Sequence, residues 1–173
     1  MITIRREENR DRQSVRLIYK AAFGQPTEAD LVDTLRKSCP DRLALVAEEG
    51  KEVVGHILFT PASITTDDGN KISGMGLAPV AVPPDLQGEG IGSRLVNEGL
   101  AILKSRQYPF VIVLGYPLYY PRFGFVPAER YNIRCQWPDV PSEAFMVRIL
   151  DKEVMSGISG GTAYYRDEFN QAV

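Results

Sequence analysis

The stretch from Leu77 to Ser93, L-A-P-V-A-V-P-P-D-L-Q-G-E-G-I-G-S, constrains the fold of this chain most strongly. It begins as a short apolar run, breaks at Pro83-Pro84, and continues through three glycines at positions 88, 90 and 92. Apolar residues then recur with the spacing of one helix face, at Ile91, Leu95, Val96, Leu100 and Leu103. A strand, a glycine-rich turn and a helix start together bring backbone N–H groups and the positive end of the helix dipole to one place. The sequence therefore predicts that residues 88–93 bind a phosphate or pyrophosphate.

The spacing of the glycines distinguishes between the known phosphate motifs. The chain has no G-x-x-x-x-G-K-[ST], which excludes a P-loop. The dinucleotide motif G-x-G-x-x-G/A nearly fits Gly88 and Gly90, but its last position is Ser93 and it stands in the middle of the chain. The pattern Q-x-x-G-x-G fits fully, with Gln87, Gly90 and Gly92 after a strand that ends V-A-V-P. This closely resembles the acyl-CoA-binding motif of the GNAT superfamily of N-acetyltransferases. The plainer alternative is a turn that only connects a strand to a helix.

A second pattern of the same family follows the next strand. Y-x-x-x-G-F is met by Tyr120, Gly124 and Phe125. The segments L-G-x-P and Y-Y-x-R-F-G-F resemble a bacterial branch of predicted acetyltransferases, and so does the tail run G-T-A-Y-Y. That branch more often has Asp where this chain has Tyr116, so the role of this position is open.

The apolar periodicity predicts a mixed α/β chain. Strands are expected at residues 2–6, 43–47, 53–65, 72–82, 110–114 and 144–150, and helices at 10–23, 27–39 and 91–106. Turns at E-E-G-K and D-D-G-N join residues 43–82 into an antiparallel three-stranded meander. The family resemblance implies one acyltransferase domain over residues 1–173. The same resemblance implies a central sheet that is mixed and mostly antiparallel, flanked by helices, with fourth and fifth strands that splay apart to receive the acyl thioester.

Composition excludes several classes of protein. The 173 residues suit one domain, and 44% hydrophobic with 24% charged residues is ordinary for a globular protein. A net charge of −2 argues against a nucleic-acid binder, and the apolar runs are too short to span a membrane. The N-terminus lacks the apolar core of a signal peptide, and the two cysteines, Cys39 and Cys135, favour a reducing cytoplasm. With His56 as the single histidine, no metal site is expected. Homodimer formation is left open.

The resemblance assigns binding roles along the central stretch. Backbone groups of Val80, Ala81 and Val82 would contact the pantetheine arm of acetyl-CoA, and the N–H near Ala81 could polarise the thioester carbonyl. Gln87 would stabilise the turn. The pyrophosphate would be bound by the following residues: Gly88, Glu89, Gly90, Ile91, Gly92 and Ser93.

The resemblance also assigns Tyr120 as the general acid that protonates the departing CoA thiolate. Its phenol, with an ordinary pKa near 10, is protonated at pH 7. The alternative role for Tyr120 is packing beside Tyr119, while Tyr116 and Tyr119 are expected in the core or the pocket wall. The general base is undetermined, because neither 72–82 nor 110–114 contains an acid. His56, Glu28, Asp30 or water are the candidates, and a lone histidine in a strand is more often structural.

Two functions follow from these residues. The first is transfer of an acetyl group from acetyl-CoA to a primary amine, by direct attack in a ternary complex, with the acceptor unidentified. The second is a non-catalytic protein that binds or senses acyl-CoA with the same fold. A missing strand carboxylate favours the second, and Tyr120 favours the first.

Overall fold

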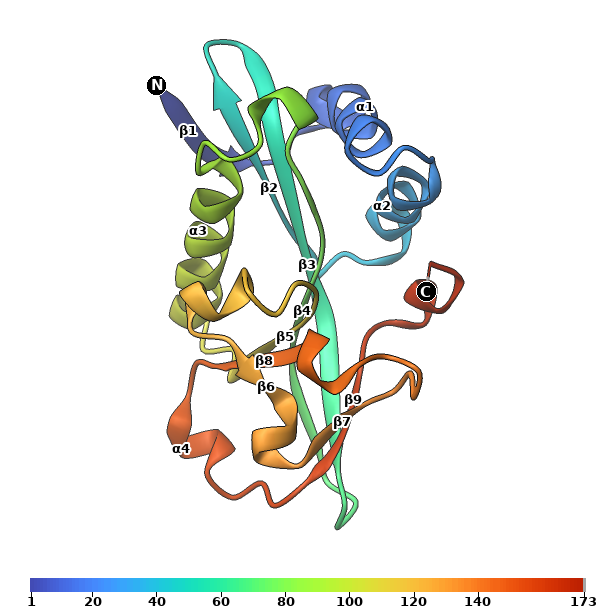
Figure 1. Ribbon diagram of the computed structural model, residues 1–173, viewed down its shortest axis with the longest axis vertical. Helices are drawn as coiled ribbons and strands as arrows, with labels where there is room; N and C mark the ends of the chain where they lie inside the picture. The colour runs from blue at the N-terminus through green and yellow to red at the C-terminus, as the bar shows by residue number, and fades with distance from the viewer. Residues whose placement is uncertain (173) are drawn as a thin grey trace. The chain divides into compact units, whose positions relative to one another are not determined.

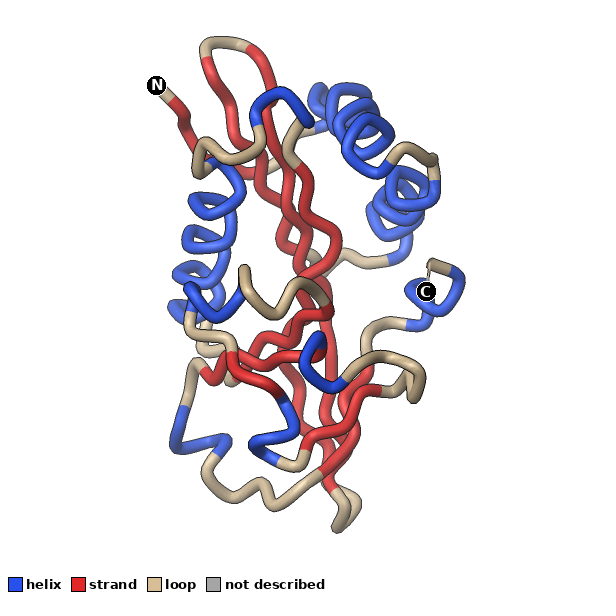
Figure 2. The backbone as a smooth tube through the Cα atoms, in the orientation of Figure 1, coloured by secondary structure: helices blue, strands red, loops and turns tan. Residues whose placement is uncertain are grey.

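A mixed α/β architecture, with helices flanking a mixed sheet, is present in the computed structural model, which describes residues 1–172 (Figures 1 and 2). The chain divides into two compact units. Unit one contains Met1–Phe59, Ala78–Gly99 and the segment that begins at Asp167, and unit two contains Thr60–Leu77 and Leu100–Arg166. Three elements, β3 (Glu52–Thr66), β4 (Lys71–Ala81) and α3 (Ile91–Ser105), have residues in both units.

Unit one has the strand order β1-β2-β3-β4. Its other elements are β1 (Ile2–Arg6), α1 (Arg12–Phe23), α2 (Thr27–Ser38) and β2 (Leu43–Glu49). The pairs β1–β2 and β2–β3 are antiparallel, and Gly50 has the positive φ of 64° that the tight β2–β3 turn requires. The predicted strands and helices of this half are therefore confirmed, with shifts of a few residues at their ends.

Alternation along β3 separates the helices of unit one into two layers. Gly55 faces α3, since a Cβ on it would lie 3.0 Å from Leu95. The next residue, His56, contacts Tyr19 of α1. Because successive strand residues point to opposite faces, α3 covers one face of β3 and α1 covers the other, as Figure 1 shows. Each of these helices buries one apolar face, formed by Val15, Ile18 and Tyr19 in α1 and by Ile91, Leu95 and Val96 in α3.

Unit two has the strand order β9-β3-β4-β5-β8-β6, with β7 beside β9. Its further elements are β5 (Phe110–Leu114), β6 (Val126–Pro127), β7 (Ile133–Cys135), β8 (Phe145–Ile149), α4 (Lys152–Met155) and β9 (Gly161–Tyr164). The pair β4–β5 is parallel, as a strand–helix–strand connection through α3 requires. β5 pairs with β8 on its other side and four of its five residues are buried, which accounts for its continuous apolar sequence.

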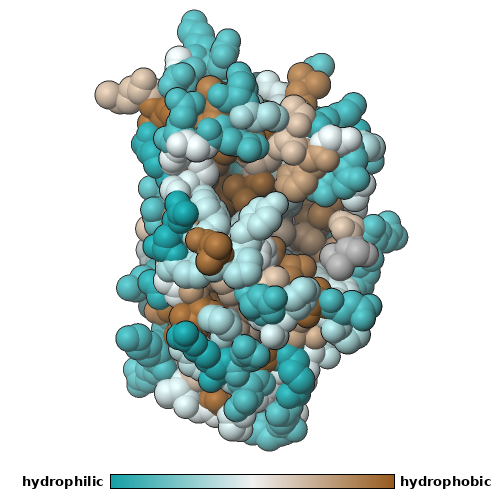
Figure 3. All heavy atoms as spheres, viewed as in Figure 1, coloured by the Kyte–Doolittle hydropathy of each residue, from teal (hydrophilic) through white to brown (hydrophobic). Residues whose placement is uncertain are grey.

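The face shown in Figure 3 is mainly hydrophilic, with scattered apolar side chains. Two of the most exposed large apolar residues, Tyr116 at 79% and Leu118 at 92%, lie in the loop after β5. Tyr116 is therefore not part of the core, and its alternative place in a pocket wall stays a prediction. Among residues 1–172, no helix combines the length and the apolar composition needed to cross a bilayer.

Candidate functional site

The last residues of β4 extend beyond its pairing with β5. The parallel pairing joins Met75, Gly76 and Leu77 to Val111, Ile112 and Val113. β4 then continues to Ala81, and Pro79 in this part has no N–H with which to donate a ladder hydrogen bond. The parallel ladder between β4 and β5 thus ends at Leu77, and the nearby proline helps to end it.

A buried tyrosine lies at the end of this ladder within unit two. The hydroxyl of Tyr165 is 3.0 Å from the carbonyl oxygen of Leu77 on β4 and 3.3 Å from that of Ile112 on β5. Trp137 stacks on the ring, with 5.8 Å between the ring centroids. Burial raises the pKa of Tyr165, so its hydroxyl remains a donor at neutral pH. Tyr165 is not among the predicted site residues; its only sequence signal is the G-T-A-Y-Y run.

Replacing Gly76 with alanine should disturb this arrangement. A Cβ on Gly76 would lie 2.5 Å from Cε1 of Tyr165, and the stacked Trp137 limits how far that ring can move. We expect Gly76→Ala to reduce the free energy of unfolding by about 1–3 kcal/mol in urea titrations. Gly157→Ala is the matched control, because no heavy atom lies within 4 Å of its added Cβ. Equal stability of the two variants would show that the Tyr165 ring adapts freely.

The glycine-rich loop in unit one has the backbone conformation expected of an anion site. Gly88 and Gly90 have φ values of 85° and 87°, and no heavy atom lies within 4 Å of a Cβ built on either. Residues 87–90 are exposed. The side-chain amide of Gln87 donates to the carbonyl of Val82 at 3.0 Å, so it stabilises the turn between β4 and the loop.

Helix α3 begins directly after this loop. The N–H of Arg94 bonds back into the turn, to the carbonyl of Gly90 at 3.1 Å. The N–H groups of Ile91 and Gly92 precede it and have no intrahelical acceptor. The first turn contains no acidic residue, so within α3 nothing offsets the positive end of the dipole. Glu89 is exposed in the loop before the helix. The predicted loop residues are therefore brought together around one helix start.

Tyr120 belongs to unit two, at the start of a short 3₁₀ turn over Tyr120–Phe123. Its side chain is 6% exposed and packs edge-on against Phe123 and Phe125. A Cβ on Gly115 would lie 2.4 Å from the Tyr120 ring, so that glycine leaves room for the phenol. Burial, followed by the charges of Tyr119 and Tyr116, raises the pKa of Tyr120. The phenol is therefore protonated throughout the neutral range.

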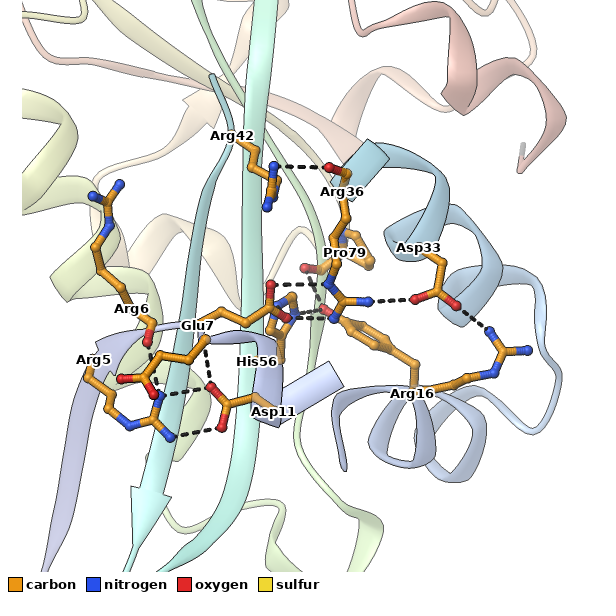
Figure 4. A network of polar contacts seen from close by, with 12 residues as sticks. Arg5, Arg6, Glu7, Asp11, Arg16, Asp33, Arg36, Arg42, His56 and Pro79 are labelled. Carbon is orange, nitrogen blue, oxygen red and sulfur yellow. Dashed lines mark hydrogen bonds and ion pairs between the residues drawn. The ribbon is translucent and has the colours of Figure 1, made fainter. Parts of the chain in front are cut away.

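His56 lies inside a polar network of unit one (Figure 4). It has no exposed surface, and its Nδ1 is 2.7 Å from the hydroxyl of Tyr19. Its Nε2 is 3.1 Å from Oε1 of Glu7, a contact with the distance of an ion pair but outside hydrogen-bond geometry. Burial lowers the pKa of His56, although the Glu7 carboxylate opposes this effect. Full burial with a neighbour at each ring nitrogen indicates a structural role rather than direct contact with a substrate amine.

Glu7 remains ionised in this buried setting because Arg36 pairs with it. The guanidinium contacts both carboxylate oxygens, at 2.6 Å and 3.1 Å, and both side chains are at most 5% exposed. Burial raises the pKa of Glu7, but its contacts with His56 and Arg36 outweigh this effect and bring the pKa to about 2. Glu7 is therefore an acceptor, never a donor, at neutral pH.

The two acids proposed as alternative bases lie at the start of α2. Glu28 is half-buried and accepts from the Gln25 amide at 3.2 Å. Asp30 is exposed and pairs with Arg16 at 2.7 Å. No three His, Cys, Asp or Glu side chains in the described part of the chain lie together where they could bind a metal ion.

Comparisons with known proteins agree with this geometry. The profile of the family described as "Acetyltransferase (GNAT) domain" matches residues 3–128. The chain is 34% identical over 162 residues to the uncharacterized N-acetyltransferase YhbS of Escherichia coli strain K12, which covers 93% of this chain and 94% of that protein. The crystal structure of YhbS in complex with CoA has a TM-score of 0.87 at 33% identity, over 98% of this chain and 92% of that one. A GNAT family acetyltransferase of Brucella melitensis in complex with acetyl-CoA has a TM-score of 0.77 at 33% identity, over 98% of both chains.

Proposed function

The chain belongs to the GNAT acetyltransferase family, and we propose that it transfers an acetyl group from acetyl-CoA to a primary amine by direct attack in a ternary complex. The observation that carries this proposal is the exposed loop with Gly88 and Gly90 at positive φ, placed between the end of β4 and the start of α3. Relatives that match nearly all of this chain have been crystallised with CoA and acetyl-CoA. We further propose that residues 1–173 act as one acyltransferase domain, since β3, β4 and α3 each run through both units.

Two parts of acetyl-CoA have a proposed partner in unit one. The pyrophosphate would accept hydrogen bonds from N–H groups of residues 88–93, where glycine leaves the backbone open and the helix dipole is positive. The pantetheine arm would lie along Val80, Ala81 and Val82, pairing with the strand as an added strand does. Gln87 acts indirectly, because its bond to the Val82 carbonyl fixes how the strand meets the loop.

The reaction requires a proton donor for the sulfur and a proton acceptor for the amine. We assign Tyr120 as the donor. A thiol has an ordinary pKa near 8.5, lower than that of a buried phenol, so complete transfer from Tyr120 to the thiolate is uphill. Tyr120 therefore stabilises the sulfur mainly through a hydrogen bond that strengthens as charge develops. The amine proton passes to water or to Glu28, because His56 is fully buried and Asp30 is paired with Arg16.

Release of the CoA thiol tests this function directly. With acetyl-CoA and a panel of primary amines, we expect thiol release that depends on the amine, measured with a thiol reagent beside a direct measurement of acetyl-CoA binding. Binding without release for any amine would favour the acyl-CoA sensor, a role consistent with the absence of acidic residues in β4 and β5. Failure to bind acetyl-CoA would contradict both functions.

A further inference from the structure

A chain of buried polar groups leads from Glu7 to β4 within unit one. Three contacts follow one another: Glu7 Oε1 to His56 Nε2 at 3.1 Å, His56 Nδ1 to the Tyr19 hydroxyl at 2.7 Å, and that hydroxyl to the Pro79 carbonyl at 2.9 Å. Figure 4 shows this network, with α2 contributing Arg36 and Asp33. His56 and Tyr19 are 0% exposed, so water does not compete for these contacts. The network therefore connects a buried ion pair to the backbone of β4.

The carbonyl at the end of this chain immediately precedes the strand segment proposed to bind pantetheine. Tyr19 bonds to the carbonyl of Pro79, and Gln87 bonds to the carbonyl of Val82. Val80–Val82 is thus held at both ends by side chains from outside the strand. Its pairing with β5 has already ended at Leu77. Side-chain contacts at the two ends therefore help to set the path of this segment.

We propose that Tyr19 is a positioning residue for the acyl-CoA site, held in place by His56 and Glu7. The peptide group between Pro79 and Val80 is planar, so fixing the Pro79 carbonyl also fixes the direction of the Val80 N–H. Through this peptide the Tyr19 hydroxyl sets the backbone that receives the pantetheine arm. The inference rests on the acyl-CoA site proposed above and adds to it residues from α1, from β3 and from the position directly after β1.

Counting protons shows how His56 controls this contact. Three contacts need three protons, because ionised Glu7 and the Pro79 carbonyl can only accept. A neutral His56 and Tyr19 supply two. If the imidazole proton is on Nε2, Nδ1 competes with Pro79 for the tyrosine proton. If it is on Nδ1, the Tyr19 hydroxyl accepts from Nδ1 and donates to Pro79, and the lone pair of Nε2 faces the Glu7 carboxylate. Protonated His56 satisfies all three contacts.

The binding state of the site should therefore be linked to the proton on Nδ1. Acetyl-CoA binding, which we propose requires the fixed Pro79 carbonyl, should favour the forms of His56 that carry this proton. By linkage, affinity should rise as the pH falls and His56 becomes protonated. The charged groups that face His56 are Glu7 after β1, Asp11 of the next turn and Arg36 of α2, and Tyr19 is its neighbour from α1. The lowered pKa of Glu7 keeps its carboxylate ionised over this range.

The single histidine makes the test specific, because every imidazole ¹⁵N signal in this chain comes from His56. At constant pH, we expect acetyl-CoA to increase the fraction of His56 with a proton on Nδ1. Tyr19→Phe keeps the ring and removes the hydroxyl. It should weaken acetyl-CoA binding about three- to tenfold, and the ligand should then leave the His56 signals unchanged. Tyr131→Phe, at a 39% exposed tyrosine in unit two, is the control and should behave as wild type.

Two results would overturn the proposal. One is the finding that acetyl-CoA binds the wild type without changing the His56 signals. This measurement uses only the wild type, so it does not depend on whether a variant folds. The other is Tyr19→Phe that binds with wild-type affinity. Absence of acetyl-CoA binding to the wild type is a different outcome, since it contradicts the proposed function itself. The CoA phosphates also titrate and contribute to the pH dependence of affinity. This contribution is the same for wild type and variant, so it cancels when the two are compared with the same ligand.

Discussion

Replacing Tyr120 with phenylalanine should lower turnover by roughly 10²–10⁴-fold and leave the affinity for acetyl-CoA nearly unchanged. Phenylalanine keeps the ring that packs against Phe123 and Phe125, and it still fits above Gly115. Only the hydroxyl is lost, and with it the proposed donor to the leaving thiolate. The measurement is kcat from thiol release together with Kd from a binding titration. A fall in kcat without a change in Kd identifies an interaction made in the transition state.

Two comparisons separate this role from packing. The loss should shrink for acyl donors whose leaving thiol is more acidic, because a less basic thiolate needs less stabilisation. Tyr119→Phe is the neighbouring control: that ring contacts the same Phe123 and lies below the guanidinium of Arg122, and its replacement should cost far less. If correctly folded Tyr120→Phe turns over like wild type with an identified acceptor, Tyr120 only packs.

Elements with a strong local signal are predicted well from the sequence. The strands Ile2–Arg6 and Phe110–Leu114 match the expectation, and the helix Ile91–Ser105 ends one residue earlier than expected. Each of these elements is marked by a hydrophobic period, a turn residue or a continuous apolar run. These signals lie within the segment itself and do not depend on distant residues. The positive φ of Gly88 and Gly90 likewise agrees with the local sequence, because glycine adopts this conformation readily in a tight loop before a helix. Family membership, first inferred from Q-x-x-G-x-G, is confirmed by the comparisons.

Features that depend on distant residues were not predictable in this way. The short strands Ile133–Cys135 and Gly161–Tyr164 pair with each other in parallel, and three or four residues give no readable period. Tyr165 reaches Leu77 across 88 positions of sequence, and His56 reaches Tyr19 across 37. These contacts are decided by packing of the whole chain, so a single sequence shows the residues but not their partners. The same limit concealed the exposure of Tyr116, for which the core was one of the two expected places.

Replacing Gly90 with aspartate should remove the stabilisation that acetyl-CoA gives the native protein. At a ligand concentration of 100 times Kd, binding to the native state alone stabilises it by about 2.7 kcal/mol, which appears as a rise in melting temperature. A carboxylate at position 90 would face the pyrophosphate at the start of α3. Two like charges 4 Å apart repel by about 1 kcal/mol in water and about 4 kcal/mol near a protein surface. Affinity should therefore fall about ten- to a thousandfold, and the shift in melting temperature should disappear.

The fold itself should tolerate this change, and controls can show it. Nothing lies within 4 Å of a Cβ on Gly90, and aspartate and asparagine adopt the left-handed region more readily than other non-glycine residues. Gly90→Asn has the same shape without the charge and should keep part of the shift, which separates repulsion from steric exclusion. Gly69→Asp also places an aspartate at a position of positive φ, 95°, in the β3–β4 turn. This variant should keep the full shift in melting temperature. A full shift in Gly90→Asp would show that the pyrophosphate binds elsewhere, because neither the charge nor the side chain would then meet the ligand.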